Sequence, residues 1–409
     1  MVNPGYKQTE IGVIPDDWDC VSLLEKCVLL NGLTYTPDNV KEHGLLVIRS
    51  SNIQNNQLVF HDAVYVDCAV ADEKRIKKKD ILICVRNGSA ALIGKCAQAY
   101  KNYDATFGAF MAVLRGDNND FLIHLLQQGT IQKEIGKNSG ATINQITNSD
   151  FKLVKIAVPT LRKEQDAIAK VLAESDRLVV SLEKLIAKKK AIKQGAMQEL
   201  LTGKKRLPGF DEKWINTKIG CMTDVYAGGT PNTSEPRYWG GSIPWMNSGE
   251  LNLKIVRKVE GRITTAGMEN SSTRFIPAEC VLIGLAGQGK TRGTAAFNTF
   301  PLCTNQSIAA IFPNPDQFDS KFMYYVMDTQ YEKLRELSSG DGGRGGLNKK
   351  LILDYEVFIP KCIDEQKTIA RCLTEIDDEI EILEKKLLKY RQVKQGMMQQ
   401  LLTGKIRLK

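Results

Sequence analysis

The chain has 409 residues, a net charge of +9 and 43% hydrophobic residues, a composition typical of a globular protein with room for two or three domains. No apolar run approaches the roughly 18 residues of a membrane span, and the N-terminus lacks a signal-peptide core, so a cytoplasmic protein with no membrane partner is expected. The ten cysteines occur singly, without a C-x-x-C pair, so no metal site is predicted.

In chain order, residues 1–158 come first and hold short β-rich runs at 45–49, 81–85 and 111–114, broken by clusters of Gly, Pro and Asn. A helix is predicted over 121–135. This mixture predicts an α+β domain with a mostly antiparallel sheet.

Residues 159–207 form the second region, which the pattern predicts to be one long helix. Pro159 precedes it and Gly203 follows it as a stop signal, and a helix over 164–201 would be about 57 Å long. Its apolar positions recur at alternating spacings of four and three, the pattern of a coiled-coil seam. They are Ile168, Leu172, Val179, Leu182, Ile186 and Leu200.

The remaining regions, 208–359 and 360–409, repeat the first two. The first of these again has β-rich runs, at 281–285 and 307–312, and a predicted helix over 322–337. The second matches the earlier helical region at a constant offset of 201 residues, and self-similarity of this length sets the organisation of a fold. Its seam contains Ile369, Leu373, Ile376, Ile380, Leu383, Leu387, Tyr390, Met397 and Leu401, with Lys394 as the one break. The two long helices are therefore predicted to pack on each other.

The charge is unevenly distributed. Regions 1–158 and 208–359 are each neutral, with 17 and 16 residues of either sign, so the whole positive excess lies on the helical regions and their tails. This pattern fits either a solvated helix face or a basic strut near a nucleic acid backbone. Neutral domains are compatible with reading bases through a few directed polar groups.

One stretch, GLAGQGKT at 284–291, matches the phosphate-binding P-loop literally and follows an apolar run. The residues after it, RGTAAFNTFPL, are poor helix formers, although a P-loop needs a helix there. The other half of the repeat has RNGSAALIGK at this place, without the lysine. A nucleotide hydrolase is therefore the weaker hypothesis. No N-P-P-[YF] methyltransferase motif and no catalytic constellation is found, so the chain is predicted not to be an enzyme.

Several stretches resemble the specificity subunit of type I restriction–modification systems. They are YKQTEIGVIPDDW near the start, GTPNTSEPRYWGGSIPWMNSGEL at 229–251, the openings with Glu-Gln five residues after Pro159 and Pro360, and the twin KQG…LLTGK tails. The resemblance covers nearly the whole chain.

The resemblance implies two target recognition domains, 1–158 and 208–359, each reading one half of a split, asymmetric site in double-stranded DNA. Conserved helical regions, central 159–207 and C-terminal 360–409, would form an antiparallel coiled coil that spaces the domains. The helices would dock two modification (methyltransferase) subunits, and restriction subunits would join them. S-adenosylmethionine, ATP and Mg would be held by those partners, and no cofactor by this chain.

DNA contacts are expected from polar, basic and aromatic residues on predicted loops, because such groups can reach phosphates or base edges. In the first domain they are Arg49, Ser50, Asn52, Lys78, Arg86, Asn87, Lys95, Thr142, Asn144 and Gln145. In the second they are Trp239, Trp245, Asn247, Ser248, Gln288, Lys290, Arg292, Arg344 and Asn348.

Three alternatives stay open at this point. The chain could be the hydrolase just described, a purely structural coiled-coil scaffold, or the specificity subunit of a fused nuclease–methyltransferase. Neither the target bases nor the spacer length follow from the sequence, because direct readout depends on side-chain pose.

Overall fold

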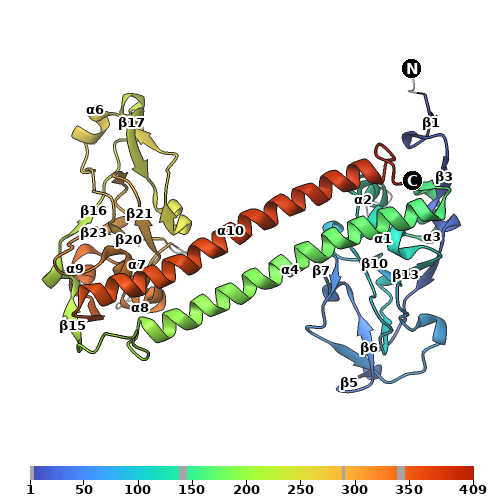
Figure 1. Ribbon diagram of the computed structural model, residues 1–409, viewed down its shortest axis with the longest axis horizontal. Coiled ribbons are helices and arrows are strands. Elements are labelled where there is room, and N and C mark those ends of the chain that lie inside the picture. The colour runs from blue at the N-terminus through green and yellow to red at the C-terminus, as the bar shows by residue number, and fades with distance from the viewer. Residues whose placement is uncertain (1–3, 138–144, 288–290, 339–345) are drawn as a thin grey trace. The chain divides into compact units, whose positions relative to one another are not determined.

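The computed structural model describes residues 4–137, 145–287, 291–338 and 346–409 (Figure 1). The chain divides into two compact units. Unit 1 comprises Met1–Glu183 and Lys385–Lys409, and unit 2 comprises Lys184–Glu384. Each unit contains one β-rich region together with parts of both long helices. The finer division at 158, 207 and 359 remains a prediction.

Unit 1 is built on a four-stranded antiparallel sheet in the order β11-β10-β13-β4, and a second sheet has the order β12-β6-β9-β5. Three further pairs, β1–β2, β3–β14 and β7–β8, complete it. The strands are β1 Tyr6–Thr9, β2 Gly12–Pro15, β3 Trp18–Ser22, β4 Cys27–Asn31, β5 Val40–Lys41, β6 Leu45–Ile48, β7 Ile53–Gln54, β8 Gln57–Leu58, β9 Val64–Val66, β10 Ile81–Cys84, β11 Cys96–Gln98, β12 Ala105–Phe107, β13 Met111–Gly116 and β14 Lys155–Pro159.

Unit 2 repeats this plan. Its main sheet has the order β16-β23-β20-β21-β18, its second sheet has the order β19-β17-β22, and β15 pairs with β24. The strands are β15 Trp214–Lys218, β16 Val225–Ala227, β17 Trp239–Met246, β18 Ile255–Val256, β19 Arg262–Ile263, β20 Val281–Gly284, β21 Ala295–Asn298, β22 Cys303–Thr304, β23 Ile308–Ile311 and β24 Glu356–Pro360. The β-rich runs predicted from the sequence are confirmed as β6, β10, β13, β20 and β23.

The central strand of each main sheet separates two cores. In β10, Ile81 and Ile83 face one hydrophobic cluster while Leu82 and Cys84 face another. Strand β20 does the same with Val281–Gly284, all buried. Successive side chains of a strand point to opposite faces, so an unbroken apolar run is the sequence that such a doubly covered strand requires.

Shorter helices cover one face of each main sheet. They are α1 Asn119–Leu126, α2 Gly129–Lys137 and α3 Asn148–Leu153 in unit 1, and α5 Ile219–Met222, α7 Ser320–Thr329, α8 Tyr331–Leu337 and α9 Lys349–Leu353 in unit 2. Helix α6, Thr265–Glu269, packs against β17 instead. The sequence predicted one helix where α1 and α2 lie and one where α7 and α8 lie. Each is interrupted instead, at Gln127–Gln128 before Gly129 and at Gln330, because the second helix turns to bury its own apolar residues, such as Ile135 and Leu334.

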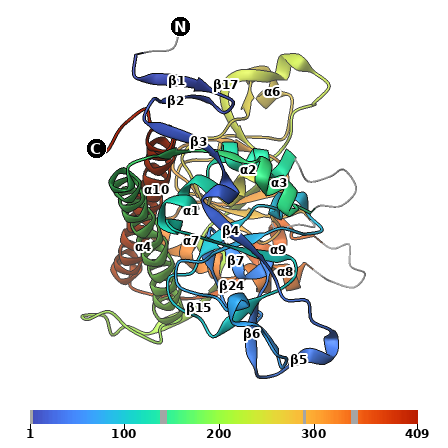
Figure 2. The same ribbon diagram turned by 90° about the vertical axis from the view of Figure 1, so that its right-hand side faces the viewer.

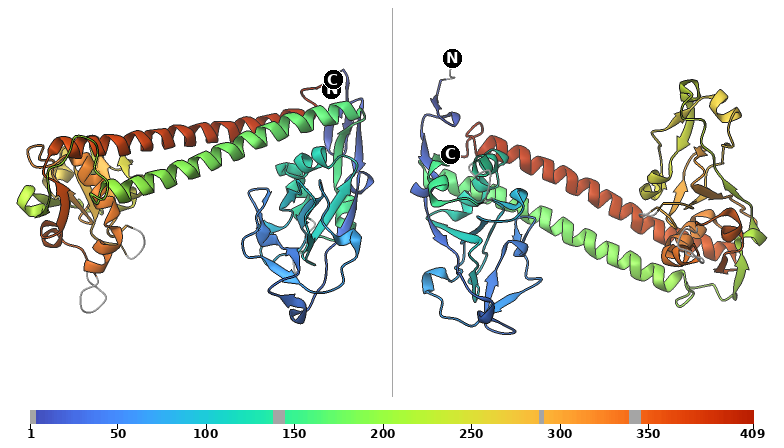
Figure 3. Two further views of the ribbon diagram at one scale, coloured as in Figure 1. Left: turned by 60° about the horizontal axis from the view of Figure 1, so that its bottom comes forward. Right: turned by 180° about the vertical axis from the view of Figure 1, so that it is seen from behind.

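The long helices are α4, Arg162–Leu200, and α10, Ile363–Leu401. Gly203 and Gly404 follow them, each with a φ of +68°, the left-handed conformation that ends helices. Half of α4 lies beside half of α10 in each unit (Figures 1 and 3). The ion pairs between them are Asp176–Lys394 and Glu183–Arg391 in unit 1, and Lys190–Glu384, Lys193–Asp377 and Lys189–Glu379 in unit 2. Within unit 1, the numbers fall along α10 as they rise along α4, so these two segments run antiparallel.

None of the predicted seam residues is exposed. Ile168 and Leu172 join the domain core of unit 1, together with Leu401, and Ile369, Leu373 and Leu200 do so in unit 2. Leu182, Ile186 and Ile380 are buried, and Val179, Ile376, Leu383, Leu387, Tyr390 and Met397 are half-buried. The first turns of each long helix therefore pack into the hydrophobic core of one unit as well as against the other long helix. No helix among the described residues combines the length and apolarity of a bilayer span.

The tail after α10 closes onto unit 1 through an arginine. Arg407 donates to both oxygens of Glu164 at 2.6 and 2.8 Å, and its guanidinium lies 5.6 Å from the ring of the fully buried Trp18. Trp18 Nε1 donates to the same carboxylate at 3.3 Å. These bonds hold the pKa of Glu164 below its usual range. We call Trp18, Glu164 and Arg407 the unit 1 clasp; beside it, Tyr6 donates to Gly404 O, so the first strand lies near the tail (Figure 2).

The tail after α4 makes the matching unit 2 clasp of Trp214, Glu365 and Arg206. Arg206 donates to the two oxygens of Glu365 at 2.6 and 2.7 Å and lies 6.0 Å from the Trp214 ring. Glu365 is fully buried. The glutamates and the arginines of the two clasps are 201 residues apart, so each repeat completes the domain of the other.

A buried polar group lies where each domain meets the long helices. In the unit 1 joint, Asp176 pairs with Lys394, and His124 Nδ1 lies 3.7 Å from Asp176 Oδ2. Burial of His124 lowers its pKa to about 4, and the attraction of Asp176 only partly opposes this. In the unit 2 joint, Lys193 pairs with Asp377 at 2.6 Å, and Tyr325 Oη donates to Asp377 at 2.9 Å. Lys394, the break in the predicted seam, is thus the partner of the half-buried Asp176.

Candidate nucleic-acid interface

Five segments of unit 1 meet at one end of its sheets. The Leu33 amide donates to Phe107 O at 2.7 Å, and the Gly108 amide to Ile48 O at 3.0 Å. The amides of Val85 and Arg86 both donate to Phe110 O, at 3.0 and 3.2 Å, and Arg86 bridges to Gln145. We call residues 33–34, 49–52, 85–87, 108–110 and 145 the unit 1 loop cluster.

Several side chains predicted to contact DNA are brought together in this cluster. Asn87 Nδ2 donates to Ser50 Oγ at 3.0 Å, which joins two segments far apart in the sequence. Arg49 pairs with Asp62 at 2.6 Å. Arg86 and Gln145 are exposed, and the Arg86 guanidinium lies 5.2 Å from the Phe110 ring centroid. The cluster therefore presents one amide–hydroxyl pair, two guanidinium groups and an exposed ring.

The prediction that Asn52 contacts DNA is wrong. Its side chain is fully buried, accepts from the Arg49 amide at 2.9 Å and donates to the carbonyls of Val59 and His61. A buried amide with these bonds fixes its own loop and has no surface to offer DNA. The role of Asn52 is to position Arg49 and Ser50.

Unit 2 has a loop cluster with the same backbone frame, formed by residues 229–230, 247–250, 285–286, 305–307 and 346–347. The Gly229 amide donates to Thr304 O, and the Asn305 amide to Met246 O, at 2.8 and 3.0 Å. The Leu285 amide donates to Ser307 O at 2.8 Å, and the Leu347 amide to Leu285 O at 3.1 Å. Each bond has a counterpart in unit 1, that of Leu347 being the bond from the Ile146 amide to Val85 O at 2.8 Å, so the residues of the two clusters can be paired.

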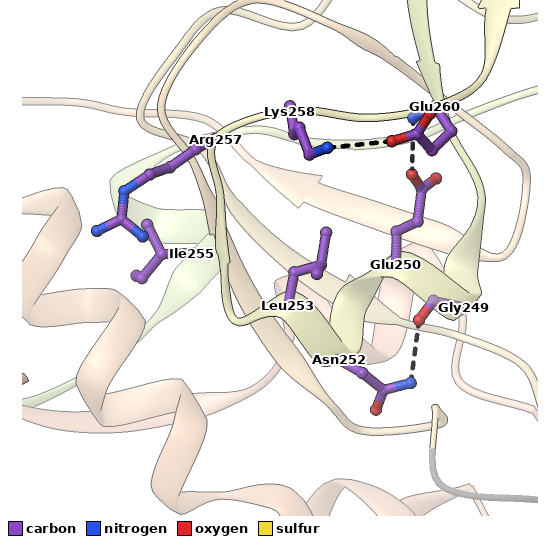
Figure 4. Close-up of a pocket in the computed structure, with 8 residues that line it drawn as sticks. All are labelled: Gly249, Glu250, Asn252, Leu253, Ile255, Arg257, Lys258 and Glu260. Atoms are coloured by element: carbon purple, nitrogen blue, oxygen red, sulfur yellow. Dashed lines mark hydrogen bonds and ion pairs between the residues drawn. The ribbon is translucent and has the colours of Figure 1, made fainter. Parts of the chain in front are cut away.

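Asn247 and Ser248 occupy the positions of Arg49 and Ser50. The Asn247 amide donates to Glu250 Oε2 at 2.9 Å, as the Arg49 amide does to Asn52. The other Glu250 oxygen accepts from the Glu260 amide at 3.1 Å. Glu250 lines a pocket of about 460 Å³ together with Arg257 and Lys258, and Figure 4 shows these residues. Glu250 thereby links the Asn247 loop to the backbone at Glu260. Asn247 itself is exposed.

The two predicted tryptophans pack on each other. Their rings meet edge to face with centroids 5.0 Å apart. Trp245 is nearly buried, at 9% exposed, and its Nε1 donates to Gly229 O at 3.0 Å. Trp245 is therefore a packing residue rather than a DNA contact, whereas Trp239 is half-buried and donates to Asn232 O.

Three other predicted residues lie apart from the clusters or have structural partners, and a fourth, Lys95, lies beside the unit 1 loop cluster. Lys78 is exposed before β10, while the cluster follows the end of that strand. Lys95 is half-buried at the cluster end of β11. Arg292 donates to Ser338 Oγ at 3.0 Å. Asn348 caps α9 by accepting from the Leu351 amide at 2.9 Å, which is a sufficient reason for an asparagine there.

Thr142, Asn144, Gln288, Lys290 and Arg344 lie outside the described residues. The described residues around GLAGQGKT are informative: Val281–Gly284 form β20, and after Thr291 the chain continues into strand β21, Ala295–Asn298. A P-loop continues into a helix that binds phosphate. The structure therefore contradicts the nucleotide-binding alternative. Over the described ranges, no three His, Cys, Asp or Glu side chains are grouped as a metal would require.

Sequence reasoning missed three residues of the clusters. Thr230 donates to Gln306 across the unit 2 cluster, at the positions that Thr34 and Ala109 occupy in unit 1. Phe110 is 52% exposed beside Arg86. The sequence signal for Thr230 and Gln306 is the Gly228–Gly229 pair before Thr230. A Cβ on either glycine would come within 2.2 Å of neighbouring atoms, so only glycine lets this loop pass so close to Ser272 and Thr304. An exposed phenylalanine has no such signal.

Comparison with known proteins gives the same organisation. The family model described as a type I restriction modification DNA specificity domain matches twice, over residues 15–194 and 211–389. A putative type I restriction enzyme MjaX specificity subunit from Methanocaldococcus jannaschii is 28% identical, over 99% of this chain and 97% of that protein. The EcoKI specificity subunit of Escherichia coli K12 is 29% identical over 50% of this chain and 46% of its own length.

Solved structures share the fold. The S subunit of a type I restriction–modification system from M. genitalium aligns over 98% of both chains with a TM-score of 0.66 and 16% identity. A chain from a structure describing complex assembly of the type I system aligns over 96% of this chain and 99% of its own, with a TM-score of 0.56 and 18% identity. The predicted resemblance is confirmed: with two recognition domains and long helices, the chain belongs to the family of type I restriction–modification DNA specificity subunits, the non-catalytic recognition components of those complexes.

Proposed function

We propose that the chain recognises a split, asymmetric DNA sequence, with each loop cluster reading one half. The observation that carries this proposal is the pairing of the clusters: five segments form the same backbone hydrogen bonds in both units but carry different side chains. Ser50 and Ser248 are common to both, while Arg49, Arg86 and Phe110 correspond to Asn247, Ala286 and Ser307. One frame with two sets of side chains is suited to reading two different sequences.

The chemistry of the clusters supports base reading. Guanidinium, amide and hydroxyl groups are the donors and acceptors that distinguish base edges in the major groove. The two β-rich regions are electrically neutral, which disfavours binding dominated by phosphate neutralisation. We propose that the charged helices run near the DNA backbone and set the unread spacer between the half-sites.

The chemical steps would belong to partner subunits. Type I complexes contain methyltransferase and restriction components, and we propose that two modification subunits dock on the long helices. S-adenosylmethionine, ATP and Mg²⁺ would then bind to those partners. Exposed apolar side chains on the helices support this docking: Leu185, Ile192 and Ile382 in unit 2, and Leu388 and Val393 in unit 1. Apolar residues exposed in groups commonly mark protein interfaces. The complex would act in the cytoplasm, where the DNA is.

The experiment is to express the chain with its modification subunits in a host without other DNA methylation and to sequence the methylated positions. The expected result is a motif of two specified halves around an unspecified spacer. A motif without a gap, or no methylation that depends on this chain, would contradict the proposal.

Variants assign the halves. Asn247→Ala and Gln306→Ala lie in the unit 2 loop cluster and are expected to relax one half only, roughly tenfold or more at a contacted position. The exposed Lys213 lies outside the clusters, so Lys213→Ala serves as the control and should leave the motif unchanged. Relaxation of both halves by one of the cluster variants would show that the clusters do not read separately.

A further inference from the structure

Arg86 differs from the other arginines in the first domain. Arg49, Arg75 and Arg115 each form an ion pair with an aspartate, at 2.6, 3.0 and 2.7 Å. Within 4–137 and the other described ranges, Arg86 forms no ion pair and is exposed. Its five N–H donors are therefore not committed to a carboxylate of its own domain.

The orientation of this guanidinium is nevertheless defined. Its centre lies 5.2 Å from the Phe110 ring centroid, and the Arg86 amide donates to Phe110 O at 3.2 Å. An aromatic face attracts a guanidinium, which can stack on the ring. The backbone bond and the ring together hold Arg86 in the unit 1 loop cluster, where it precedes Asn87 in the chain and forms a β-bridge with Gln145.

The fold does not require this pair of residues. In unit 2 the counterpart of the Val85–Phe110 backbone bond joins the Leu285 amide to Ser307 O at 2.8 Å, and the residues that match Arg86 and Phe110 are Ala286, which is exposed, and Ser307. The frame is therefore stable with neither the arginine nor the ring. Keeping a phenylalanine 52% exposed is unfavourable in water, so a role in binding accounts for it better than folding does.

We propose that Arg86 is a specificity-determining residue that reads a guanine in the half-site of unit 1, with Phe110 as its positioning residue. This inference rests on the proposed function. A guanidinium forms two parallel hydrogen bonds to O6 and N7 of guanine, which is the commonest base-specific contact of arginine. Phosphate is the other anionic acceptor that DNA offers, but a phosphate contact carries no sequence information.

The test is the methylation motif of the complete complex carrying Arg86→Ala, Arg86→Gln or the wild-type chain. With Arg86→Ala, the preference for guanine at one position of one half-site is expected to fall roughly 10- to 100-fold, with the other positions unchanged. With Arg86→Gln, that position is expected to shift toward adenine, because glutamine pairs bidentately with adenine. Phe110→Ala should relax the same position to a smaller extent.

Arg75→Ala is the matched control, because Arg75 is also an exposed arginine of this domain but is paired with Asp104. It should leave the motif intact. Uniformly weaker methylation of all sequences by Arg86→Ala would instead identify a phosphate contact, and an unchanged motif would exclude contact; either result overturns the inference. Arg86→Gln keeps a polar side chain of similar reach, so its motif decides the matter if the alanine variant folds poorly. If the wild-type complex itself methylated no split motif, the proposed function would be refuted instead.

Discussion

In unit 1 the buried side chain beside the aspartate–lysine pair is His124, whereas in unit 2 the corresponding side chain, 201 residues later, is Tyr325. Tyr325 donates a hydrogen bond to Asp377. His124 Nδ1 has no hydrogen-bond partner among the described residues, and it lies 3.7 Å from Asp176. The same geometry is therefore satisfied by a hydroxyl in one unit and left with a titratable imidazole in the other. The two clasps, in contrast, use identical residue types. The repeats therefore conserve charge pairing between helices, but only unit 1 has a buried imidazole at this position, so the stabilities of the two units are expected to respond differently to pH.

The largest effect is expected at the unit 1 clasp. Arg407→Ala leaves the buried Glu164 carboxylate without its cation, and breaking such a pair costs about 3 kcal/mol of unfolding free energy. Hydrogen exchange resolved along the chain measures it, and the loss of protection should be confined to unit 1. Arg206→Ala should do the same in unit 2, by less, because Arg407 also bonds Asp17 through two nitrogens. Lys409→Ala, which removes only an exposed pair with Asp17, is the control. Equal loss of protection in both units would contradict the assignment of each tail to one unit.

The second effect tests the difference between the joints through pH. The pKa of His124 is lowered to about 4 from 6.5, so below pH 6.5 the unfolded chain binds a proton that the folded chain does not. The contribution of neutral, buried His124 to the unfolding free energy is therefore complete above pH 6.5 and declines as the pH falls toward 4. Between pH 7 and 5, unit 1 should lose about 2 kcal/mol of unfolding free energy through this group.

His124→Tyr imports the residue of unit 2 and should abolish that part of the pH dependence. Acid also weakens the clasp, because the pKa of Asp17 is lowered to about 2 and that of Glu164 is lowered as well, both mainly by Arg407. These carboxylates are present in the wild type and in the variant, so the difference between the two proteins isolates the histidine. Identical slopes of stability against pH in the two proteins would show that His124 is not the responsive group.

A smaller effect is expected from Tyr325→Phe. The variant removes the hydroxyl that donates to Asp377 at 2.9 Å while keeping the ring. Loss of a hydrogen bond to a charged group costs about 1.5–3 kcal/mol, and the lower end applies here because Asp377 is only half-buried. Hydrogen exchange in α7 and in the first turns of α10 measures it. His124→Phe is the comparison in unit 1: because Nδ1 makes no hydrogen bond among the described residues, it should cost less at pH 7. A greater cost for His124→Phe would reverse our view of the two joints.

The smallest effect concerns exposed ion pairs between the long helices. Glu183–Arg391 and Lys190–Glu384 occupy corresponding positions in the two units, and exposed pairs contribute about 0.5 kcal/mol. Double-mutant cycles on both pairs should give similar coupling energies, which high salt should reduce. A coupling several times larger in one unit would show that the helix contacts are less alike than the residues suggest.

Much of the fold follows from local signals in the sequence. The four-three spacing and the glycines at 203 and 404 predict the long helices, and the apolar runs predict β10 and β20, because each signal acts within a few residues. The interrupted helices were not predicted, since α2 and α8 turn toward cores that form only after folding. The clasps were not predicted either: Arg407 and Glu164 are 243 residues apart, and neither residue type indicates its partner.

The candidate site was less predictable than the fold for a related reason. Asn52 and Asn247 are both polar residues of loops, yet the first is buried and the second is exposed. In the second case the N-S-G-E run at 247–250 has the spacing of a capping box, in which both Asn247 and Glu250 form structural hydrogen bonds while Asn247 stays exposed. In the first case Asn52 itself takes the place of Glu250, and nothing nearby in the sequence distinguishes it from a residue that faces DNA.

The contacts between the repeats have one more property. Asp176 pairs with Lys394, and the residues 201 positions later and earlier, Asp377 and Lys193, pair in the same way. In an interface between two identical subunits related by a two-fold axis, residue i contacts j and j contacts i. The chain thus has the contact pattern of a homodimer whose subunits have been joined into one polypeptide. Two identical subunits can recognise only a palindromic target. In a fused chain, the loop cluster of either unit can change by mutation without the other, while the contacts between the long helices are retained.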